Sequence, residues 1–445
     1  MLNKLKHLTA PLSINFEITE RCNLKCSFCY CSSEEYKQQF SGNDTFDSSY
    51  FSRLTDILDI LKKSGVFEIR FFGGEFSIYP KWKELMAYAH DLDFFISFVS
   101  NGVLFSNEDI NFFQDVGITS CAISLHGDES THDNITGIRG SFKRTINTIK
   151  NLQAKGIDVS VPFTPNVLNI DSFEKYCDLL IEDHGISGIG VNRLFPCDGF
   201  KPLTLNDYKK IFKVIERVRS KHGLTINFID SFPRCQVDVK YWNYVTNCSQ
   251  GVAFGQVNYN GDVKNCSSIC ENLGNLFEDD LTTIWNKRLF HFRNLEYLPL
   301  SCKICPVFCG GGCIASRTTK KNFQSDIFIP RKEEESIKDT LIITIANYLK
   351  KYKYHKIQSK SIEKRTSKKY TITDTPKIGK HKYRKENEDY IVMIEKNGIF
   401  FVDETTIKLL PELNGKNTII EVANKYMLKV DEVISIVNGF LSPSR

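Results

Sequence analysis

The 445-residue sequence has no long hydrophobic run. No apolar stretch approaches the roughly 20 residues that a helix needs to cross a bilayer. Residues 1–20 contain neither an uninterrupted apolar core nor a small-residue cleavage site, so they do not read as a secretory signal peptide. We therefore expect a cytoplasmic protein with no membrane partner.

The sequence also lacks a strong excess of charge of one sign. Its 58 Lys and Arg residues stand against 53 Asp and Glu residues, which gives a formal net charge of +5. Much of this excess comes from one Lys/Arg-rich stretch around residues 349–384. A charge this modest and this local does not indicate a nucleic-acid partner for the whole chain. We also find no short-period repeat.

Cysteine is plentiful, with 15 residues. Cytosolic thiols are kept reduced, and the number is odd, so a complete disulfide framework is disfavoured. Dense, closely spaced cysteines in a reducing compartment are more often metal ligands. The cysteines are therefore the first place to look for function.

The first half of the chain alternates strand-like and helix-like segments. Strands are predicted at 13–19, 67–72, 94–100, 120–125, 158–164 and 188–194. Helices are predicted at 47–63, 80–91, 107–115, 140–155, 171–184 and 206–221. Six strand-then-helix units favour an α/β fold with a parallel sheet, curved into a partial (β/α)6 TIM barrel. Function is then expected at the carboxyl ends of the strands.

The composition changes after the sixth unit, and four regions follow from it. Residues 1–230 are assigned to the partial barrel, and residues 231–332 to a Gly/Cys-rich region that holds eight of the 15 cysteines. Residues 333–375 are predicted to form a helix and a basic, flexible linker. Residues 376–445 carry a hairpin pattern and three helical patterns, which predict a small winged-helix-like α+β domain.

Three cysteines directly after the first predicted strand form the clearest motif. Cys22, Cys26 and Cys29 have the spacing C-x3-C-x2-C, and Cys31 lies outside it. Three thiolates on one short loop can hold three irons of a [4Fe–4S] cluster and leave the fourth iron open. Zinc is the chemical rival, but structural zinc usually takes four ligands and paired cysteines. Unrelated buried thiols would not be expected at this spacing.

The segment "CNLKCSFCY" resembles the signature of radical S-adenosylmethionine (radical SAM) enzymes. "FFGGEF", "VSNG" and "SLHG" then follow on successive predicted strands, in the order found in that family. The resemblance implies that the open iron binds S-adenosylmethionine and that a 5′-deoxyadenosyl radical abstracts hydrogen from the substrate. The implied cofactor contacts are Phe28, Gly73, Gly74, Glu75, Ser100, Asn101 and Ser124. Thr136 stands where many relatives carry Arg, and Arg139 is the nearest substitute for that contact.

The later cysteines resemble the SPASM extension of radical SAM enzymes, which implies one or two auxiliary [4Fe–4S] clusters. One expected ligand set is Cys235, Cys248, Cys266 and Cys313, and the other is Cys302, Cys305, Cys309 and Cys270. The spacing between Cys305 and Cys309 is shorter than the family's, and the usual last cysteine is absent, with Arg331 near its expected place. An open iron and a zinc ribbon at "CKIC…CGGGC" remain as alternatives.

Four cysteines remain outside these ligand sets: Cys31, Cys121, Cys177 and Cys197. Cys121 and Cys177 lie in strand and helix patterns and are expected to be core thiols. Cys197 and its neighbour Asp198 follow the sixth strand and either face the cavity or lie in a solvated turn.

The C-terminal segment resembles the peptide-recognition module typified by the peptide chaperone of pyrroloquinoline quinone synthesis. Such modules bind a leader peptide by adding it as a strand at a sheet edge. A DNA-binding winged helix is the alternative, but the segment shows no recognition-helix stripe.

Together these resemblances imply a radical SAM/SPASM enzyme that modifies a ribosomally synthesised precursor peptide. The expected product is a thioether or a carbon–carbon crosslink, with flavodoxin or ferredoxin as an electron donor. The alternatives are peptide epimerisation, a sulfatase-type (formylglycine) maturase, and a non-catalytic iron–sulfur carrier.

Overall fold

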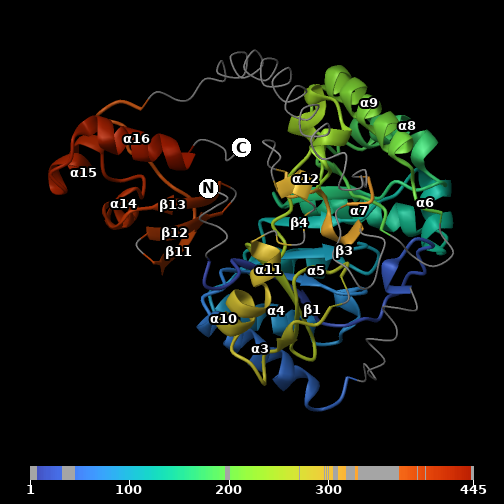
Figure 1. Ribbon diagram of the computed structural model, residues 1–445, viewed down its shortest axis with the longest axis horizontal. Helices are drawn as coiled ribbons and strands as arrows, with labels where there is room; N and C mark the ends of the chain where they lie inside the picture. Colours follow the sequence, from blue (N-terminus) through green and yellow to red (C-terminus); the bar gives the residue numbers. More distant parts are fainter. Residues whose placement is uncertain are drawn as a thin grey trace. The chain divides into compact units, whose positions relative to one another are not determined.

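The computed structural model divides the chain into two compact units (Figure 1). One unit is Ala10–Tyr354, and the other joins Met1–Thr9 to His355–Arg445. The structure describes residues 8–32, 46–195, 201–269, 271–294, 296, 298, 300–303, 309–316, 326–328, 370–387, 389–395 and 397–441. Within this part of the chain, no helix has the length and apolar character needed to cross a membrane.

A ten-stranded sheet organises the larger unit, in the order β10-β9-β8-β1-β2-β3-β4-β5-β6-β7. Its strands are β1 (Ser13–Glu17), β2 (Glu68–Phe72), β3 (Phe95–Ser100), β4 (Ser120–Ile123), β5 (Asp158–Phe163), β6 (Ile189–Val191), β7 (Asn227–Phe228), β8 (Phe254–Asn258), β9 (Asp262–Lys264) and β10 (Gly274–Asn275). Strands β1 to β7 run parallel in chain order, and β8 pairs parallel to the other side of β1. The sheet is therefore a partial barrel that the Cys-rich region extends.

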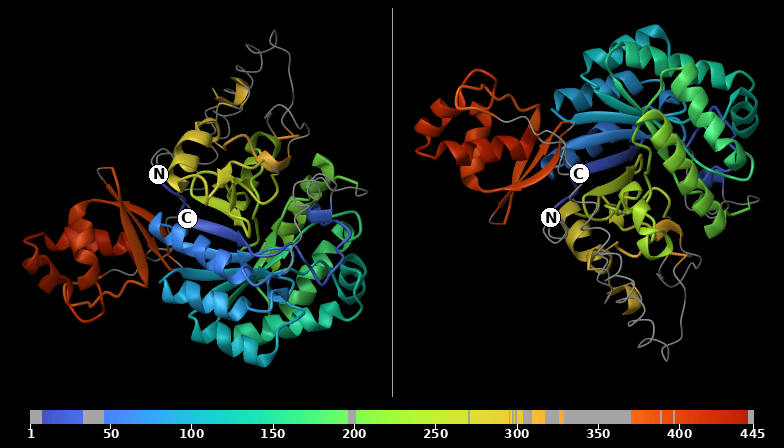
Figure 2. Two further views of the ribbon diagram at one scale, coloured as in Figure 1. Left: turned by 90° about the horizontal axis from the view of Figure 1, so that it is seen from below. Right: turned by 90° about the horizontal axis from the view of Figure 1, so that it is seen from above.

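Helices connect the parallel strands. They are α3 (Tyr50–Lys63), α4 (Trp82–Asp91), α5 (Asn107–Asp115), α6 (Glu129–Thr136), α7 (Ser141–Ala154), α8 (Phe173–Asp178) with a π-helical turn (Leu179–Asp183), and α9 (Leu205–His222). The later helices are short: α10 (Leu281–Thr283), a π-helical turn (Ile284–Arg288), α11 (Phe290–Arg293) and α12 (Leu300–Lys303). Figure 2 shows the helices of the first half along one face of the sheet and the Cys-rich region on the other side.

All six strands predicted from the sequence are confirmed, as β1 to β6, and each predicted crossover contains a helix. Two capping boxes explain where α5 and α9 begin. Ser106 and Asp109 bond each other's backbone at the start of α5, and Thr204 and Asp207 do the same at α9. Helix α6 and strands β7 to β10 were not predicted, because these elements are short and weakly periodic.

An aromatic cluster lies between the sheet and its helices. Phe98 packs on Phe113 with ring centroids 4.5 Å apart, and Phe76 packs on Phe98 at 5.4 Å. Trp82 meets Phe76 edge-on at 5.6 Å. Since Phe76 directly follows the Gly-Gly-Glu turn, this packing anchors one wall of the site.

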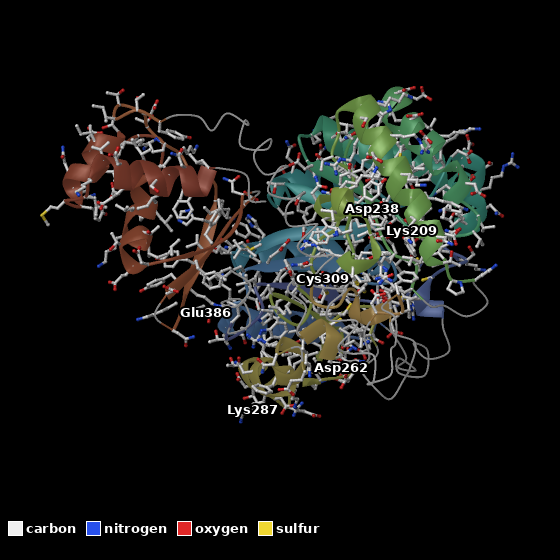
Figure 3. The ribbon with its side chains drawn as sticks, turned by 45° about the horizontal axis from the view of Figure 1, so that its top comes forward. Lys209, Asp238, Asp262, Lys287, Cys309 and Glu386 are labelled. Carbon is white, nitrogen blue, oxygen red and sulfur yellow. The ribbon has the colours of Figure 1, made fainter. Side chains whose placement is uncertain are left out.

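The smaller unit contains a three-stranded antiparallel sheet in the order β11-β12-β13. Its elements are β11 (His381–Glu386), β12 (Asp389–Ile394), β13 (Gly398–Val402), α14 (Glu404–Leu409), a 3-10 turn (Leu410–Glu412), α15 (Ile419–Lys425) and α16 (Val430–Leu441). The predicted hairpin is β12 with β13, and the three predicted helices are present. Strand β11 was missed because its sequence is mostly charged. Glu386, which is labelled in Figure 3, lies at the end of this strand. Its carboxylate accepts from the Thr9 backbone N–H at 3.1 Å.

Several sequence predictions lie outside the described residues. These are the helix expected near 333–351, most of the basic linker, and Cys197, Asp198, Cys270, Cys305 and Arg331. Cys121 and Cys177 are both buried, as expected for core thiols.

Candidate functional site

The loop that follows β1, here called the cluster loop (residues 22–29), carries the cysteine trio. The last turn of α6 holds this loop in place. The backbone N–H of Lys25 donates to the Thr136 carbonyl at 3.0 Å. The backbone N–H of Ser27 donates to the Ile135 carbonyl at 2.9 Å. The loop is therefore shaped by backbone contacts that do not involve its thiols.

The three thiols of the cluster loop lie close enough to influence one another. Desolvation raises the pKa of Cys22 to about 11 and that of Cys26 to about 12, and Coulomb repulsion from Cys29 adds to both. The metal-free thiols are therefore neutral at pH 7, and iron must displace their protons to bind. Three thiols on one short loop fit the ligand set of a [4Fe–4S] cluster with one open iron.

Gly73 and Gly74 are required for the close approach of their turn to the segment before Cys22. Gly73 has φ +156, and a Cβ there would overlap the Thr19 carbonyl oxygen. A Cβ on Gly74 would overlap the carbonyl oxygens of Glu20 and Arg21. Only glycine allows this backbone contact, so the turn directly supports the start of the cluster loop.

Glu75 is 2% exposed, and its carboxylate accepts hydrogen bonds from nearby residues. Its carboxylate accepts from Ser77 Oγ at 2.7 Å, from Ser100 Oγ at 2.9 Å and from the Asn101 backbone N–H at 2.8 Å. Burial raises the pKa of Glu75, and these hydrogen bonds oppose that rise. In this structure Glu75 orders the Ser-Asn-Gly turn, and its contact with S-adenosylmethionine stays a prediction.

Asn101 connects the Ser-Asn-Gly turn to the cluster loop. Its Nδ2 donates to Asn23 Oδ1 at 2.8 Å, and its Oδ1 accepts from the Val103 backbone at 2.9 Å. Its carbonyl accepts from Thr145 Oγ1 at 2.8 Å. The side chain and the backbone of Asn101 are therefore both fixed.

His126 packs against the aromatic residue of the cluster loop. The rings of Phe28 and His126 meet edge-on, with centroids 4.9 Å apart. Burial lowers the pKa of His126 to about 3, so the ring is neutral at pH 7. Its Nδ1 accepts from the Thr164 backbone N–H at 3.3 Å, which leaves the proton on Nε2. The motif "SLHG" was identified in the sequence, but no role was predicted for His126.

A cavity of about 890 Å³ joins two groups of cysteines in the larger unit. The first cysteine field is the trio of the cluster loop, and the second cysteine field is the set of cysteines within residues 231–332. Cys22, Cys26 and Cys29 line it, as do Cys31, Cys248, Cys266 and Cys313. Of the predicted cofactor contacts, it is also lined by Phe28, Gly73, Gly74, Ser100, Asn101 and Ser124. Thr136 lines it too, whereas the exposed Arg139 is not among its lining residues in the described chain.

The second cysteine field brings together three of the four ligands expected for one cluster. Cys248 and Cys266 both act electrostatically on Cys313, which is deeply buried. Buried polar atoms with no partner among the described residues face the same cavity, at Ser231 Oγ and Asn247 Oδ1. Three thiols beside unsatisfied polar groups fit an iron–sulfur cluster.

The other expected ligands are placed only partly. Cys235 is exposed and does not line the cavity; Gln236 Nε2 lies 3.5 Å from its Sγ. Cys302 and Cys309 are half-buried. Their predicted partners Cys270 and Cys305 lie outside the described residues, so the second ligand set stays a prediction.

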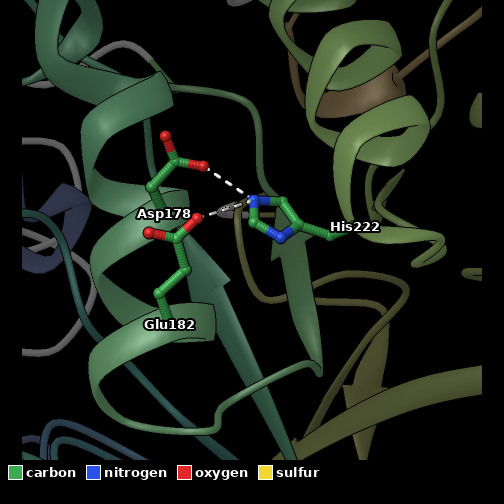
Figure 4. A group of neighbouring side chains, drawn as sticks. All are labelled: Asp178, Glu182 and His222. Atoms are coloured by element: carbon green, nitrogen blue, oxygen red, sulfur yellow. Dashed lines mark hydrogen bonds and ion pairs between the residues drawn. The ribbon is translucent and has the colours of Figure 1, made fainter.

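Another group of metal-type side chains lies on α8, the π-helical turn after it, and α9. Asp178, Glu182 and His222 bring three possible ligand atoms within 4.8 Å of one another (Figure 4). Lys221 Nζ also contacts both carboxylates, at 3.0 and 2.9 Å. Since a cation already compensates the carboxylates, we interpret this group as an ion-pair network that joins the helices.

Two family models match the larger unit. The radical SAM superfamily model matches residues 16–180. The SPASM model, an iron–sulfur cluster-binding domain, matches residues 248–306. The two matches contain the two cysteine fields, apart from Cys235 just before the second match and Cys309 and Cys313 just beyond it.

Three curated relatives illustrate the range of similar proteins. The sporulation killing factor maturation protein SkfB of Bacillus subtilis (strain 168) is 28% identical over 284 residues, 62% of this chain and 64% of SkfB. The antilisterial bacteriocin subtilosin biosynthesis protein AlbA of the same organism is 26% identical over 345 residues, 73% and 72% of the two chains. Fe-coproporphyrin III synthase of Methanosarcina barkeri (strain Fusaro / DSM 804) is 30% identical over 170 residues, 38% and 40%. This chain therefore spans less than two thirds of the length of SkfB.

Among solved structures, Streptococcus suis SuiB bound to S-adenosylmethionine is similar in fold, with a TM-score of 0.55 and 19% identity. The match covers 71% of this chain and 75% of SuiB. The fold, the ordered motifs and the family matches agree, so residues 16–180 form a radical SAM domain and residues 248–306 a SPASM domain.

Proposed function

We propose that this protein is a radical SAM peptide maturase that modifies a ribosomally synthesised precursor peptide, forming a thioether or a carbon–carbon crosslink. The observation that carries the proposal is a cavity of about 890 Å³ that is lined by residues of both the cluster loop and the second cysteine field. A cavity of this volume is of the size that binds small molecules, and the peptide segment to be modified would enter beside the cofactor.

The cofactors follow from the two domains. A radical SAM domain binds a [4Fe–4S] cluster and S-adenosylmethionine, and a SPASM domain binds auxiliary iron–sulfur clusters. When bound, these groups supply the 5′-deoxyadenosyl radical chemistry. The protein's residues supply position: Cys22, Cys26 and Cys29 hold the first cluster, and Gly74 and Asn101 fix the loop that carries them. Cys248, Cys266 and Cys313 are the proposed ligands on the other side.

The names of the relatives support a peptide substrate. SkfB is named as a maturation protein of a killing factor, AlbA as a bacteriocin biosynthesis protein, and SuiB has been seen bound to its precursor peptide SuiA. The name Fe-coproporphyrin III synthase supports a tetrapyrrole instead. AdoMet-dependent heme synthases, whose name also refers to a tetrapyrrole, match 66–67% of this chain at 22–24% identity. We favour the peptide because SkfB and AlbA are 28% and 26% identical, and because the AlbA match covers 73% of this chain. A cytoplasmic location and a flavodoxin or ferredoxin donor belong to the same proposal.

The smaller unit is proposed to bind the leader of the precursor peptide. Strand β13 ends the described sheet and pairs with β12. Phe400 of β13 packs edge-on against Phe440 of α16, with centroids 5.2 Å apart. A leader that adds as a strand beside β13 would extend the sheet and meet the apolar side of α16.

The proposal is tested by incubating the anaerobically reconstituted protein with dithionite, S-adenosylmethionine and a precursor peptide encoded near its gene. A product lighter by two hydrogens supports a crosslink, and an unchanged mass with an inverted residue would indicate an epimerase. Formylglycine on a sulfatase peptide without a leader would indicate the sulfatase-type alternative. Absorbance titration with Fe-coproporphyrin III tests whether the protein binds a tetrapyrrole instead of a peptide.

A further inference from the structure

A buried ion pair joins the end of the barrel to the end of the Cys-rich region. Arg193 follows β6, and its guanidinium pairs with both carboxylate oxygens of Asp326, 133 positions away in the sequence. The Nη2–Oδ1 distance is 3.1 Å, and the side chains are 1% and 0% exposed. Fully buried charges are rare unless they are paired, so this pair is a specific feature of the fold.

Aromatic rings surround the Arg193 guanidinium. Its Cζ lies 4.8 Å from the ring centroid of Phe232, 5.0 Å from that of Phe328 and 5.8 Å from that of Tyr208. The rings keep water away from the charge, which therefore acts over a longer range than a surface charge does.

Asp326 also holds the last cysteine of the Cys-rich region. Its Oδ2 accepts from the Cys313 backbone N–H at 2.8 Å. The preceding Gly312 has φ +80, and a Cβ there would overlap the Asp326 carboxylate. The chain thus approaches Asp326 as closely as glycine permits and then presents Cys313 to the cavity.

Arg193 and Cys313 line the same cavity and share the Asp326 carboxylate as a hydrogen-bond partner. The Arg193 guanidinium thus brings a buried positive charge to the wall of the cavity that carries Cys313. The acidic groups beside Cys313 are the Asp326 and Asp230 carboxylates and the thiols of Cys248 and Cys266. The Asp230 carboxylate is itself held by the Arg193 backbone N–H at 2.7 Å. Arg193 therefore opposes the accumulation of negative charge at this wall of the cavity.

We propose that Asp326 and Arg193 are positioning residues for the auxiliary cluster, in which Asp326 seats Cys313 and Arg193 stabilises the negative charge of the thiolates and of the reduced cluster. This inference rests on the proposed ligand role of Cys248, Cys266 and Cys313. It implies that the midpoint potential of that cluster depends on Arg193, which a purely structural ion pair would not require.

The test uses the full chain with Cys22, Cys26 and Cys29 replaced by Ala, so that the remaining iron is auxiliary. In this background we compare Arg193→Gln with Arg217→Gln. Arg217 is a matched control because it also forms a bidentate pair, with Glu174, but the pair is on the surface, with side chains 55% and 41% exposed. The readouts are iron per chain and the midpoint potential from a redox titration followed by electron paramagnetic resonance.

We expect Arg193→Gln to bind less auxiliary iron or, where the iron is retained, to shift its midpoint potential to a more negative value. Arg217→Gln should change neither. If Arg193→Gln does not fold, the double variant Arg193→Met/Asp326→Leu replaces the pair with apolar groups and is measured in the same way. Unchanged iron and unchanged potential in the folded variant would overturn the inference. Cys266→Ala is the separate control: if it keeps all its iron, the ligand assignment itself fails.

Discussion

Asn101 Nδ2 donates a hydrogen bond of 2.8 Å to Asn23 Oδ1, 78 positions earlier in the sequence. The same residue donates from its backbone to Glu75. Two turns and the cluster loop are therefore one hydrogen-bonded unit. The geometry of the loop depends on residues that do not bind iron themselves.

Replacing Asn101 with Ala removes the side-chain bond to the cluster loop. Partners that orient metal ligands typically contribute about 10- to 100-fold to metal affinity or activity. We therefore expect a loss of that order in 5′-deoxyadenosine formation, measured by chromatography under saturating dithionite.

Asn151 provides the matched control for this substitution. Its Nδ2 donates to Asn107 Oδ1 at 3.1 Å in a similar Asn–Asn pair that is exposed. Asn151→Ala should leave 5′-deoxyadenosine formation unchanged. Equal losses in the two variants would show that the Asn101 contact has no special role.

Gly74→Ala should impair cluster assembly. The added Cβ would overlap the carbonyl oxygens of Glu20 and Arg21, so the segment before Cys22 must move. Overpacking of this kind costs about 1–3 kcal/mol. We expect less iron per chain after reconstitution, measured by iron and sulfide analysis. Gly439→Ala, where a Cβ meets nothing within 4 Å, should load normally.

Removing the smaller unit should separate leader binding from cofactor chemistry. We expect deletion of residues 375–445 to weaken leader binding by at least about tenfold, or about 1.4 kcal/mol. Fluorescence anisotropy with a labelled leader measures this. Peptide-independent cleavage of S-adenosylmethionine should persist, because all residues that line the cavity belong to Ala10–Tyr354. Unchanged leader affinity would show that this unit does not bind the leader.

The Asp178 ion-pair network predicts a stability that depends on pH. The hydrogen bond with His222 lowers the pKa of Asp178 in the folded chain, and Lys221 adds to this effect. The stabilisation is complete above the unfolded pKa of about 3.9 and is lost as the pH falls through the lower folded value. Asp178→Asn should therefore lower the thermal midpoint at pH 6 more than at pH 3.5. A difference independent of pH would contradict this assignment.

The sequence predicted the parallel sheet and the order of its motifs well. Most of the six strands are short runs rich in β-branched or aromatic residues, and each motif follows the end of a strand, where a parallel sheet gathers side chains. The Gly-Gly-Glu turn was also readable from the sequence, because adjacent glycines allow a close backbone approach. In the structure Gly73 and Gly74 meet backbone atoms, and no side chain larger than hydrogen fits there.

Other features depend on contacts that local patterns do not contain. Strand β8 pairs with β1 across more than 200 positions, and nothing in its composition specifies that partner. The Arg193–Asp326 pair spans 133 positions, and each residue alone reads as an ordinary surface charge. The neutral state of His126 arises from burial against Phe28, which its sequence neighbours do not reveal.

The central claim is that the cluster loop and the second cysteine field serve one radical reaction on a peptide. Mass spectrometry of the precursor peptide, after anaerobic turnover with dithionite and S-adenosylmethionine, tests it most directly. We predict a product that has lost two hydrogens, formed together with 5′-deoxyadenosine, and neither product from the Cys22→Ala/Cys26→Ala/Cys29→Ala variant. An unmodified peptide with no 5′-deoxyadenosine from the fully reconstituted protein would contradict the account.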